Sequence, residues 1–494
     1  MRGASRAERV GMLAASSHAS HASHATPRRR ALVLALLLAL LAFAASACTS
    51  DDGSDAADSV DDEASALEGG RIVPDGEMPS LPLRTHGRFI VDATGRRFKL
   101  ASVSWYGAES PDLVPGGLDR VEVHAMAKRI KSLGFHSVRL PWSNELVRLF
   151  RRHPEFRLAP TPKPAPDPDV AVVADVGLVA ANPGFEKLHP LVIFDRVVDA
   201  LTSEGILVVL DNHTSRADWC CDTFDGNGLW YRDDANEADR YDEQHWLAHW
   251  RFMARRYAGN PRVIGAELRN ELRAANGLHP TWGDGDHRTD WHRAAQLGGD
   301  AVLGIAPQWL VFVGGLEWSQ HLEGVRDTPI ALSVPNRLVY APHEYSFFHA
   351  DLDAHGYSGN PHAYAETLGD RWGFILTQGK PWTAPIWVSE LGTCTGRHAC
   401  ISDDAAGSQG QWFDYVRRYI SGADMDFAYW SLNGTQGSQQ PDSRRAATNK
   451  RTRGRPEGYG ILTHDWTVPT ATDGAKLELL QALQAMAPAR QGPR

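Results

Sequence analysis

Short apolar runs alternate with segments of helical periodicity along most of the chain, starting near Pro82. An uninterrupted apolar run is typical of a strand buried on both faces, as in a parallel sheet. Eight such runs predict strands: Phe98–Trp105, His136–Leu140, Ile206–Leu210, the stretch Val263–Leu272, Leu310–Val313, Leu338–Ala341, Pro385–Ser389 and Asp426–Trp430.

Between these runs, apolar residues recur every three or four positions, which is the spacing of one helix face. Val123, Met126, Ile130 and Leu133 form the first such face, and Gly134 ends it. Further helices are predicted near residues 191–201, 246–257, 291–303, 364–377, 409–420 and 476–486.

The repeated strand–helix order predicts a parallel α/β sheet, and the count of eight strands favours a closed barrel over an open sheet. We therefore predict a single (β/α)8 TIM barrel in residues 82–494. Such barrels are typically about 250 residues long and grow by loop insertion. The longest loops follow predicted strands two, three and eight, and five prolines between Pro160 and Pro168 mark one insertion.

The first 47 residues have the zones of a leader and secretory signal peptide. Arg28–Arg30 precede an apolar run, Ala31–Phe43, which is too short to span a bilayer comfortably. Both ordinary signal cleavage and a bacterial lipoprotein site place the cut before Cys48. Residues 48–81 are predicted to be a solvated acidic tether, because they contain few large apolar side chains. We expect an exported protein, extracellular or attached to the cell surface through a lipid on Cys48.

Export places the other four cysteines in an oxidising compartment, where disulfides form. Cys394 and Cys400 are close enough in sequence to staple a small loop. Cys220 and Cys221 would then form a vicinal pair, but both could instead reach across to the other two. No histidine lies at ligand spacing beside either pair, so we predict disulfides rather than a metal site.

The composition is that of a soluble globular protein, with 43% apolar and 22% charged residues. A net charge of −9 argues against nucleic acid as a partner, because phosphate binding requires a concentrated basic face. Nothing in the sequence implies a cofactor. The 16 tryptophans fit both core packing and flat platforms for sugar rings. Trp246, Trp250, Met253 and Tyr257 recur at helical spacing and are interpreted as core, with carbohydrate contact as the alternative.

Candidate functional residues stand at the ends of the predicted strands. In a parallel barrel the carboxyl ends of the strands converge on one face, where the chemistry of such folds is found. The residues at these positions are Trp105, Arg139, His213, Asn270, Glu271, His343, Tyr345, Glu390 and Trp430.

Two of these residues, Glu271 and Glu390, end predicted strands four and seven, which face each other across the barrel. Retaining glycoside hydrolases require such a pair, about 5–5.5 Å apart, with one carboxylate as nucleophile and the other as acid and then base. Arg139 and Tyr345 would keep the nucleophile ionised and oriented, and Asn270 could hydrogen-bond a sugar hydroxyl.

At these residues the chain resembles the family 5 glycoside hydrolases, the cellulase family of the strand-4/strand-7 barrel clan. The matching motifs are Arg139-Leu140-Pro141, Asp211-x-His213, Asn270-Glu271, His343-x-Tyr345, Glu390-x-Gly392 and Tyr429-Trp430-Ser431. Three further segments look like the bacterial endo-β-1,4-glucanases: Trp105-Tyr106-Gly107, Val334–Tyr340 and Gly460-Ile461-Leu462 with Asp465-Trp466.

The resemblance implies retaining hydrolysis, with Glu271 as acid/base and Glu390 as nucleophile. It places five residues around the cleaved sugar, with Trp430 stacked beneath it; the five are Arg139, His213, Asn270, His343 and Tyr345. The chain departs from the family pattern at Leu272, where the family often has proline. The segment Trp219–Asp222 and the loop 434–458 also differ from those of a minimal cellulase.

We therefore expect a monomeric, exported retaining glycosidase that cleaves β-linked oligo- or polysaccharides, most simply as an endo-β-1,4-glucanase. Long loops could instead close one end of the cleft, as in an exo-acting β-glycosidase or diglycosidase, a mannanase or a glycolipid glycosidase. The alternative from another class is a non-catalytic surface protein that binds carbohydrate.

Overall fold

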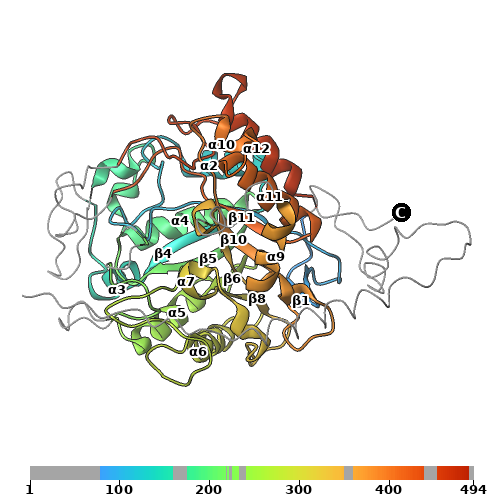
Figure 1. The fold of residues 1–494 in the computed structure, drawn as a ribbon. Helices are drawn as coiled ribbons and strands as arrows, with labels where there is room; N and C mark the ends of the chain where they lie inside the picture. Colours follow the sequence, from blue (N-terminus) through green and yellow to red (C-terminus); the bar gives the residue numbers. More distant parts are fainter. Residues whose placement is uncertain are drawn as a thin grey trace, which may run out of the picture. The chain divides into compact units, whose positions relative to one another are not determined.

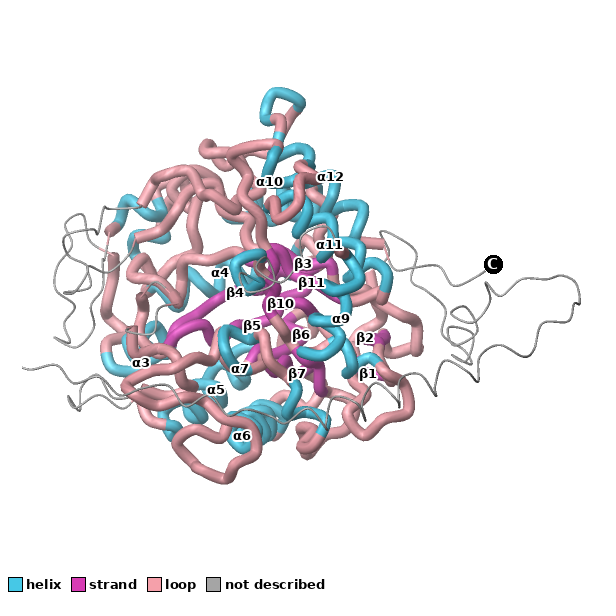
Figure 2. Tube along the Cα trace, viewed as in Figure 1, coloured by secondary structure: helices cyan, strands magenta, loops and turns pink. Residues whose placement is uncertain are grey.

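Nine strands form one parallel sheet at the centre of the computed structural model (Figure 2). Its hydrogen-bonded order is β8-β7-β6-β5-β4-β3-β11-β10-β9. The strands are β3 (Ala101–Ser104), β4 (Ser137–Ser143), β5 (Leu207–Thr214), β6 (Val263–Glu267), β7 (Leu310–Val313), β8 (Leu338–Tyr340), β9 (His343–Glu344), β10 (Trp387–Leu391) and β11 (Asp426–Tyr429).

The structure describes residues 78–158, 175–218, 220–221, 225–232, 241–349, 360–438 and 453–488. The predicted signal peptide, Cys48 and most of the predicted tether lie outside the described residues. So do the segment with Pro160–Pro168, the residues Trp219 and Asp222, and positions 439–452 of the loop 434–458.

The sheet closes into a barrel because β8 and β9 are two parts of one strand, interrupted at Ala341 and Pro342. One part pairs with β7 and the other with β10. A parallel bridge between Tyr340 and Ile386 joins the two edges, and the Tyr340 amide donates to the Pro385 carbonyl at 3.0 Å. Counting β8 and β9 as one strand gives eight, which confirms the predicted (β/α)8 barrel.

Helices surround the strands, as Figure 1 shows for α5, α6, α9 and α11. The helices that follow barrel strands are α2 (Val123–Ser132), α4 (Pro190–Ser203), α5 (Glu243–Tyr257), α6 (Trp291–Leu303), α9 (Pro361–Arg371), α11 (Gln409–Gly422) and α12 (Ala475–Met486). Trp246, Trp250, Met253 and Tyr257 of α5 are all buried, which confirms their interpretation as core.

Several elements were not predicted from the sequence. They are the antiparallel hairpin β1 (Arg84–His86) and β2 (Phe89–Val91), and the helices α3 (Asn144–Arg152), α7 (Leu316–Ser319) and α10 (Ala399–Ser402). After β7, α7 and a short 3-10 helix, Glu323–Arg326, take the place of a full barrel helix. No helix in the described ranges combines the length and apolar character needed to cross a bilayer.

The core has two layers, and the side chains of each strand alternate between them. In β5, Leu207 and Val209 belong to a cluster inside the barrel, whereas Val208 and Leu210 pack outward against the helices. The inner cluster also contains Ile90 of the hairpin, so the hairpin closes the end of the barrel at which the strands begin. The opposite end, where the strands finish, is left for the candidate site.

A buried charge cluster lies at the end where the strands begin. The Arg97 guanidinium is 3.0 Å from Asp426 Oδ1 and 3.3 Å from Asp424 Oδ2. Lys99 Nζ lies 3.3 Å from Asp424 Oδ1. Asp426 also accepts the Leu100 amide at 2.6 Å. The cluster therefore ties the segment before β3 to the start of β11.

The loops after β4, β5 and β11 are long, in agreement with the prediction, and one disulfide lies in a loop while the other joins a loop to the short helix α10. Cys220 is bonded to Cys221, and Cys394 is bonded to Cys400. Of the pairings that the sequence left open, the structure thus has the local one.

Candidate active site

Arg139 is the centre of the polar groups at the mouth of the barrel. Its neighbours Val138 and Leu140 belong to the outer core, so alternation turns Arg139 inward, where it is fully buried. Its guanidinium donates hydrogen bonds to three side chains: Nε to Glu267 at 2.5 Å, Nη1 to Glu390 at 2.6 Å and Nη2 to Asn270 at 2.7 Å. Nη2 also forms an ion pair with Asp211, at 3.1 Å from Oδ2. This one side chain therefore fixes groups from three strands.

Glu390 lies within β10 and is 5% exposed. Arg139 binds its Oε1, and the Tyr345 hydroxyl donates to its Oε2 at 2.9 Å. Burial and the neighbouring Glu390 charge hold the pKa of Tyr345 well above its usual value, so the phenol keeps the proton that it donates. Gly392 is required nearby, because a Cβ there would lie 2.6 Å from the Trp430 carbonyl oxygen and 3.2 Å from the Tyr345 ring.

Asn270 and Glu271 follow β6 rather than ending it, since the strand stops at Glu267. The indoles of Trp246 and Trp250 donate to the Leu268 carbonyl at 3.3 and 3.1 Å, so α5 holds this segment from behind. Glu271 has a φ of +40°, a strained value for a residue with a side chain.

Leu272, the residue at which the chain departs from the family pattern, is fully buried in the outer core. Its carbonyl accepts the Trp318 amide at 2.9 Å. The leucine therefore anchors the backbone next to Glu271.

His343 lies between the two candidate catalytic carboxylates. Its Nδ1 is 3.0 Å from Glu271 Oε1 and 3.6 Å from Glu390 Oε2. Burial lowers the pKa of His343, but the carboxylates of Glu390, Glu267 and Glu271 outweigh this effect and raise it to about 10. The imidazole is therefore protonated at neutral pH.

Facing atoms of Glu271, His343 and Glu390 all lie within 4.8 Å of one another. This spacing could hold a cation, but the protonated His343 already supplies a positive charge there. His213 forms a second close group with Cys220 and Cys221. The two sulfurs are bonded to each other, so they offer no thiolate ligand.

His213 and Asp211 form the support on the other side of Asn270. His213 Nδ1 lies 2.6 Å from Asp211 Oδ2, and its Nε2 lies 3.3 Å from Asn270 Nδ2. Burial, together with the Arg139 charge, lowers the pKa of His213 to about 4. The neutral ring then donates from Nδ1 to Asp211 and accepts from Asn270 at Nε2.

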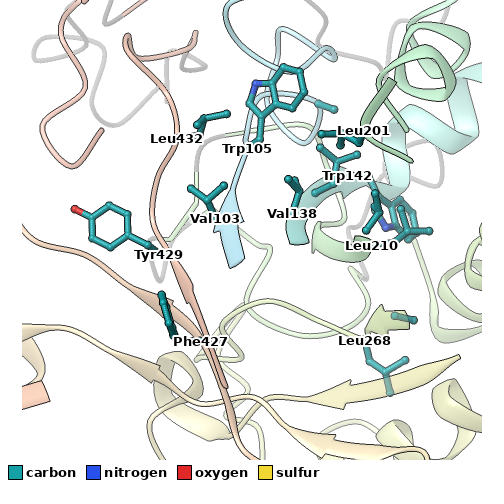
Figure 3. Packing of buried hydrophobic residues seen from close by; sticks show 14 of the residues in the cluster. Val103, Trp105, Val138, Trp142, Leu201, Leu210, Leu268, Phe427, Tyr429 and Leu432 are labelled. Carbon is teal, nitrogen blue, oxygen red and sulfur yellow. The ribbon is translucent and has the colours of Figure 1, made fainter. Parts of the chain in front are cut away.

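The two predicted aromatic contacts have different positions. Trp430 is half-buried at the mouth and stacks on both Tyr106 and His213, with ring centroids 5.0 and 5.6 Å away. Trp105 is fully buried in the outer core (Figure 3), and its indole donates to the Gly116 carbonyl at 2.9 Å. This position contradicts the prediction that Trp105 binds substrate, because no part of its ring is exposed to a ligand.

The structure brings the other predicted residues together: Arg139, His213, Asn270, Glu271, His343, Tyr345, Glu390 and Trp430. It adds Glu267 and Tyr106, which the sequence analysis did not select as site residues, and it places Asp211 of the motif Asp211-x-His213 beside Arg139 and His213. For Glu267 a signal was present, since an acid inside the apolar strand Val263–Glu267 needs a buried partner. Arg139 and nearby His343 lower the pKa of Glu267 to about 2, although burial opposes this.

The separation of the two carboxylates indicates the type of chemistry. An oxygen of Glu271 lies within 4.8 Å of an oxygen of Glu390. Inverting glycosidases leave about 6.5–9.5 Å for a water molecule, whereas retaining enzymes have the shorter spacing of about 5–5.5 Å. The closed barrel, the close carboxylates and the arginine and tyrosine that bind one of them together define a glycoside hydrolase.

Comparison with known proteins gives the family. The model of the cellulases, glycosyl hydrolase family 5, matches residues 91–436, and the chain belongs to this family. An endoglucanase from Paenibacillus polymyxa is 30% identical over 402 residues, which cover 78% of this chain and 83% of that protein.

Solved structures agree with this assignment. The catalytic domain of the major endoglucanase from Xanthomonas campestris pv. campestris is 27% identical, with a TM-score of 0.59 over 82% of this chain and 100% of that chain. A cellotetraose complex of an endocellulase from Pyrococcus horikoshii is 25% identical, with a TM-score of 0.59 and the same coverage of both chains. The chain is thus an enzyme that acts on O-glycosyl bonds.

Proposed function

We propose that this protein is a retaining endo-β-1,4-glucanase in which Glu390 is the nucleophile and Glu271 the acid/base. The observation that carries the proposal is the close carboxylate pair, in which only Glu390 is bound by both Arg139 and Tyr345. The substrate follows from the relatives, since the similar proteins are endoglucanases and one similar structure holds cellotetraose.

In the first step, Glu390 attacks the anomeric carbon and forms a covalent glycosyl-enzyme. Arg139 and Tyr345 hydrogen-bond one oxygen each, so they orient the carboxylate and stabilise its charge before attack. The charge on this carboxylate disappears when the ester forms. The positive charge of Arg139 is then still balanced by Glu267, so the guanidinium is not left buried without a counter-ion.

Glu271 supplies the proton for the leaving glycosidic oxygen and later takes one from the attacking water. The His343 Nδ1 proton lies in a 3.0 Å hydrogen bond with Glu271 Oε1. His343 therefore holds Oε1 of Glu271 in place, and the proton for the leaving oxygen is carried by the other oxygen, Oε2.

Asn270, His213 and Trp430 surround the sugar that is cleaved. Asn270 hydrogen-bonds a ring hydroxyl, and His213 and Arg139 keep its amide in one orientation. Trp430 offers a half-exposed aromatic surface, which suits the apolar face of a pyranose ring.

The decisive experiment combines two substitutions with azide. Glu390→Gln and Glu271→Gln should each lower kcat on cello-oligosaccharides by at least about 10⁴-fold without changing the melting temperature appreciably. Azide should restore turnover to Glu390→Ala with release of the α-glycosyl azide. Glu323→Gln, an exposed carboxylate, is the matched control. Undiminished hydrolysis in either glutamine variant refutes the mechanism, and release of end units only from soluble oligosaccharides refutes endo action.

We further propose that the enzyme acts outside the cytoplasm as a monomer, attached to the cell surface through a lipid on Cys48. Support comes from the signal-like segment before Cys48 and from a similar protein described as the major extracellular endoglucanase of Xanthomonas campestris pv. campestris. Equal distribution of wild type and Cys48→Ala between membrane and soluble fractions would rule out the anchor.

A further inference from the structure

The Cys220–Cys221 disulfide lies against the candidate acid/base residue, and nothing in the mechanism above uses it. The two sulfurs are 3.4 and 3.6 Å from Asn270 Nδ2, and Cys220 Sγ is 3.8 Å from Glu271 Oε2. Both cysteines are half-buried at the edge of the site. The disulfide therefore touches both the acid/base residue and the neighbouring residue that binds the sugar.

These contacts constrain Glu271 in a particular way. A bonded sulfur carries no hydrogen, so its contact with Oε2 is packing and not a hydrogen bond. His343 binds Oε1, while no group in the described part of the chain donates a hydrogen bond to Oε2. The disulfide thus limits rotation of the carboxylate and leaves Oε2 as the oxygen that is free to meet the substrate.

Trp318 connects the same disulfide to the backbone of the acid/base segment. Its indole donates to the Cys221 carbonyl at 3.3 Å, and its amide donates to the Leu272 carbonyl at 2.9 Å. Trp318 and its two neighbours, Glu317 and Ser319, all have positive φ, at 57°, 47° and 63°. Three consecutive left-handed residues with side chains persist only where surrounding contacts require them.

We propose that the Cys220–Cys221 disulfide is a positioning group for catalysis, which holds Asn270 and Glu271 so that Glu271 Oε2 faces the glycosidic oxygen. This inference rests on the proposed function, because it gives the disulfide a role only if Glu271 is the acid/base. The second disulfide, Cys394–Cys400, provides the comparison. Within the described ranges it makes no hydrogen bond or ion pair with Asn270, Glu271 or Glu390.

The test uses the dependence of the rate on the leaving group. A dinitrophenyl β-cellobioside needs no proton to depart, whereas phenyl β-cellobioside and cellotetraose do. kcat/KM reports the glycosylation step alone. Cys220→Ala/Cys221→Ala should lose about 10- to 100-fold in kcat/KM on the poor leaving groups, a part of the roughly 10²–10⁴-fold that general acid catalysis contributes. The loss should be markedly smaller on the dinitrophenyl substrate, which still uses Asn270 but needs no proton from Glu271. Cys394→Ala/Cys400→Ala should change both substrates equally.

A second measurement tests the proposal even if Cys220→Ala/Cys221→Ala does not fold. In the Cys394→Ala/Cys400→Ala background, dithiothreitol reduces Cys220–Cys221 by delivering two electrons and two protons, and is itself oxidised to its cyclic disulfide. Treatment should reproduce the selective loss on poor leaving groups, and reoxidation should reverse it.

Equal losses on both classes of substrate, or no loss on either, overturn the positioning role. These results are distinct from failure of the proposed function, in which wild type would hydrolyse no cellobioside or Glu271→Gln would show no leaving-group dependence.

Discussion

The two ends of the barrel each hold a buried charge cluster, and the two clusters are built differently. Where the strands begin, two cations, Arg97 and Lys99, meet two anions, Asp424 and Asp426. The numbers of positive and negative groups are equal. Backbone groups complete the contacts, since Arg97 also donates to the Phe98 carbonyl at 2.7 Å.

Where the strands finish, acids outnumber bases. Arg139 and His343 face Glu267, Glu390, Asp211 and Glu271, and one oxygen of Asp211 has no hydrogen-bond partner in the described part of the chain. A protein that only needed stability would balance this set, because an uncompensated buried charge is costly. The excess of carboxylates at one end is useful only if protons move there.

The largest expected effect is on stability at the balanced end. Arg97→Met leaves two buried aspartates without their main cation and should lower the free energy of unfolding by about 3–5 kcal/mol. kcat should stay within about twofold, since the site at the other end is untouched. Urea unfolding and kcat on cello-oligosaccharides measure the two quantities. Arg196→Met, an exposed position with a 55% exposed side chain, is the control and should change stability by less than about 0.5 kcal/mol. A proportional loss of kcat in Arg97→Met would show that the two ends are not independent.

The next effect is on catalysis at the unbalanced end. Arg139→Lys keeps the charge but cannot donate to Glu267, Glu390 and Asn270 at once, because lysine is a single point donor. kcat/KM should fall by about 10²–10³-fold, in the range found when one fixed donor to developing charge is removed. The free energy of unfolding should change far less than in Arg97→Met. Arg418→Lys, on the surface of α11, is the matched control. An unchanged kcat/KM would mean that a positive charge at this position supports catalysis without the several fixed donors of the guanidinium.

The smallest expected effect is on the pH dependence of the free energy of unfolding. Free histidine titrates near 6.5, while burial lowers the pKa of His213 to about 4 in the folded protein. Its contribution to stability is therefore present above pH 6.5 and is lost as pH falls from 6.5 to 4. Near pH 5.5 the wild type should take up about one proton more on unfolding than His213→Asn does. The free energy of unfolding should therefore rise with pH less steeply in the variant, by about 1.4 kcal/mol per pH unit.

His343 should behave in the opposite way, because its folded pKa is raised to about 10, so its contribution is fully present below pH 6.5 and is lost as pH rises from 6.5 to about 10. His287→Asn, at an exposed histidine far from this cluster in sequence, is the control variant. A slope in His213→Asn equal to that of wild type would show that His213 is charged in the folded site.

The strands and the position of Glu390 could be predicted because they depend on local pattern. Glu390 is part of an apolar run whose direction fixes the end at which its side chain lies. Arg139 follows the same rule, since alternation along β4 decides that it points inward. Their catalytic roles stay predictions, because geometry brings the groups together without measuring turnover.

The features that the sequence did not predict depend on tertiary contacts or on very short segments. Each strand of the β1–β2 hairpin has three residues, too few for a period to appear. Helix α3 begins at Asn144, directly after the last residue of β4, and its N-cap, Ser143, is itself a strand residue, so no loop separates the two elements. Trp105 was placed in the site because an aromatic residue at a strand end suits a core and a cleft equally well. The offset of Glu271 from β6 is set by α5, which no local pattern reveals.

The pairing of the first barrel strand with the last has a consequence for the order of folding. Ala101 of β3 is in register with Phe427 of β11, and the Arg97–Asp426 contact spans 329 residues. Contacts of such sequence separation form late, since the intervening chain must be ordered first. The aspartates that pair with Arg97 and Lys99 are therefore among the last barrel residues to be synthesised. The last strand closes the barrel, and a chain cut before it lacks both partners of these cations.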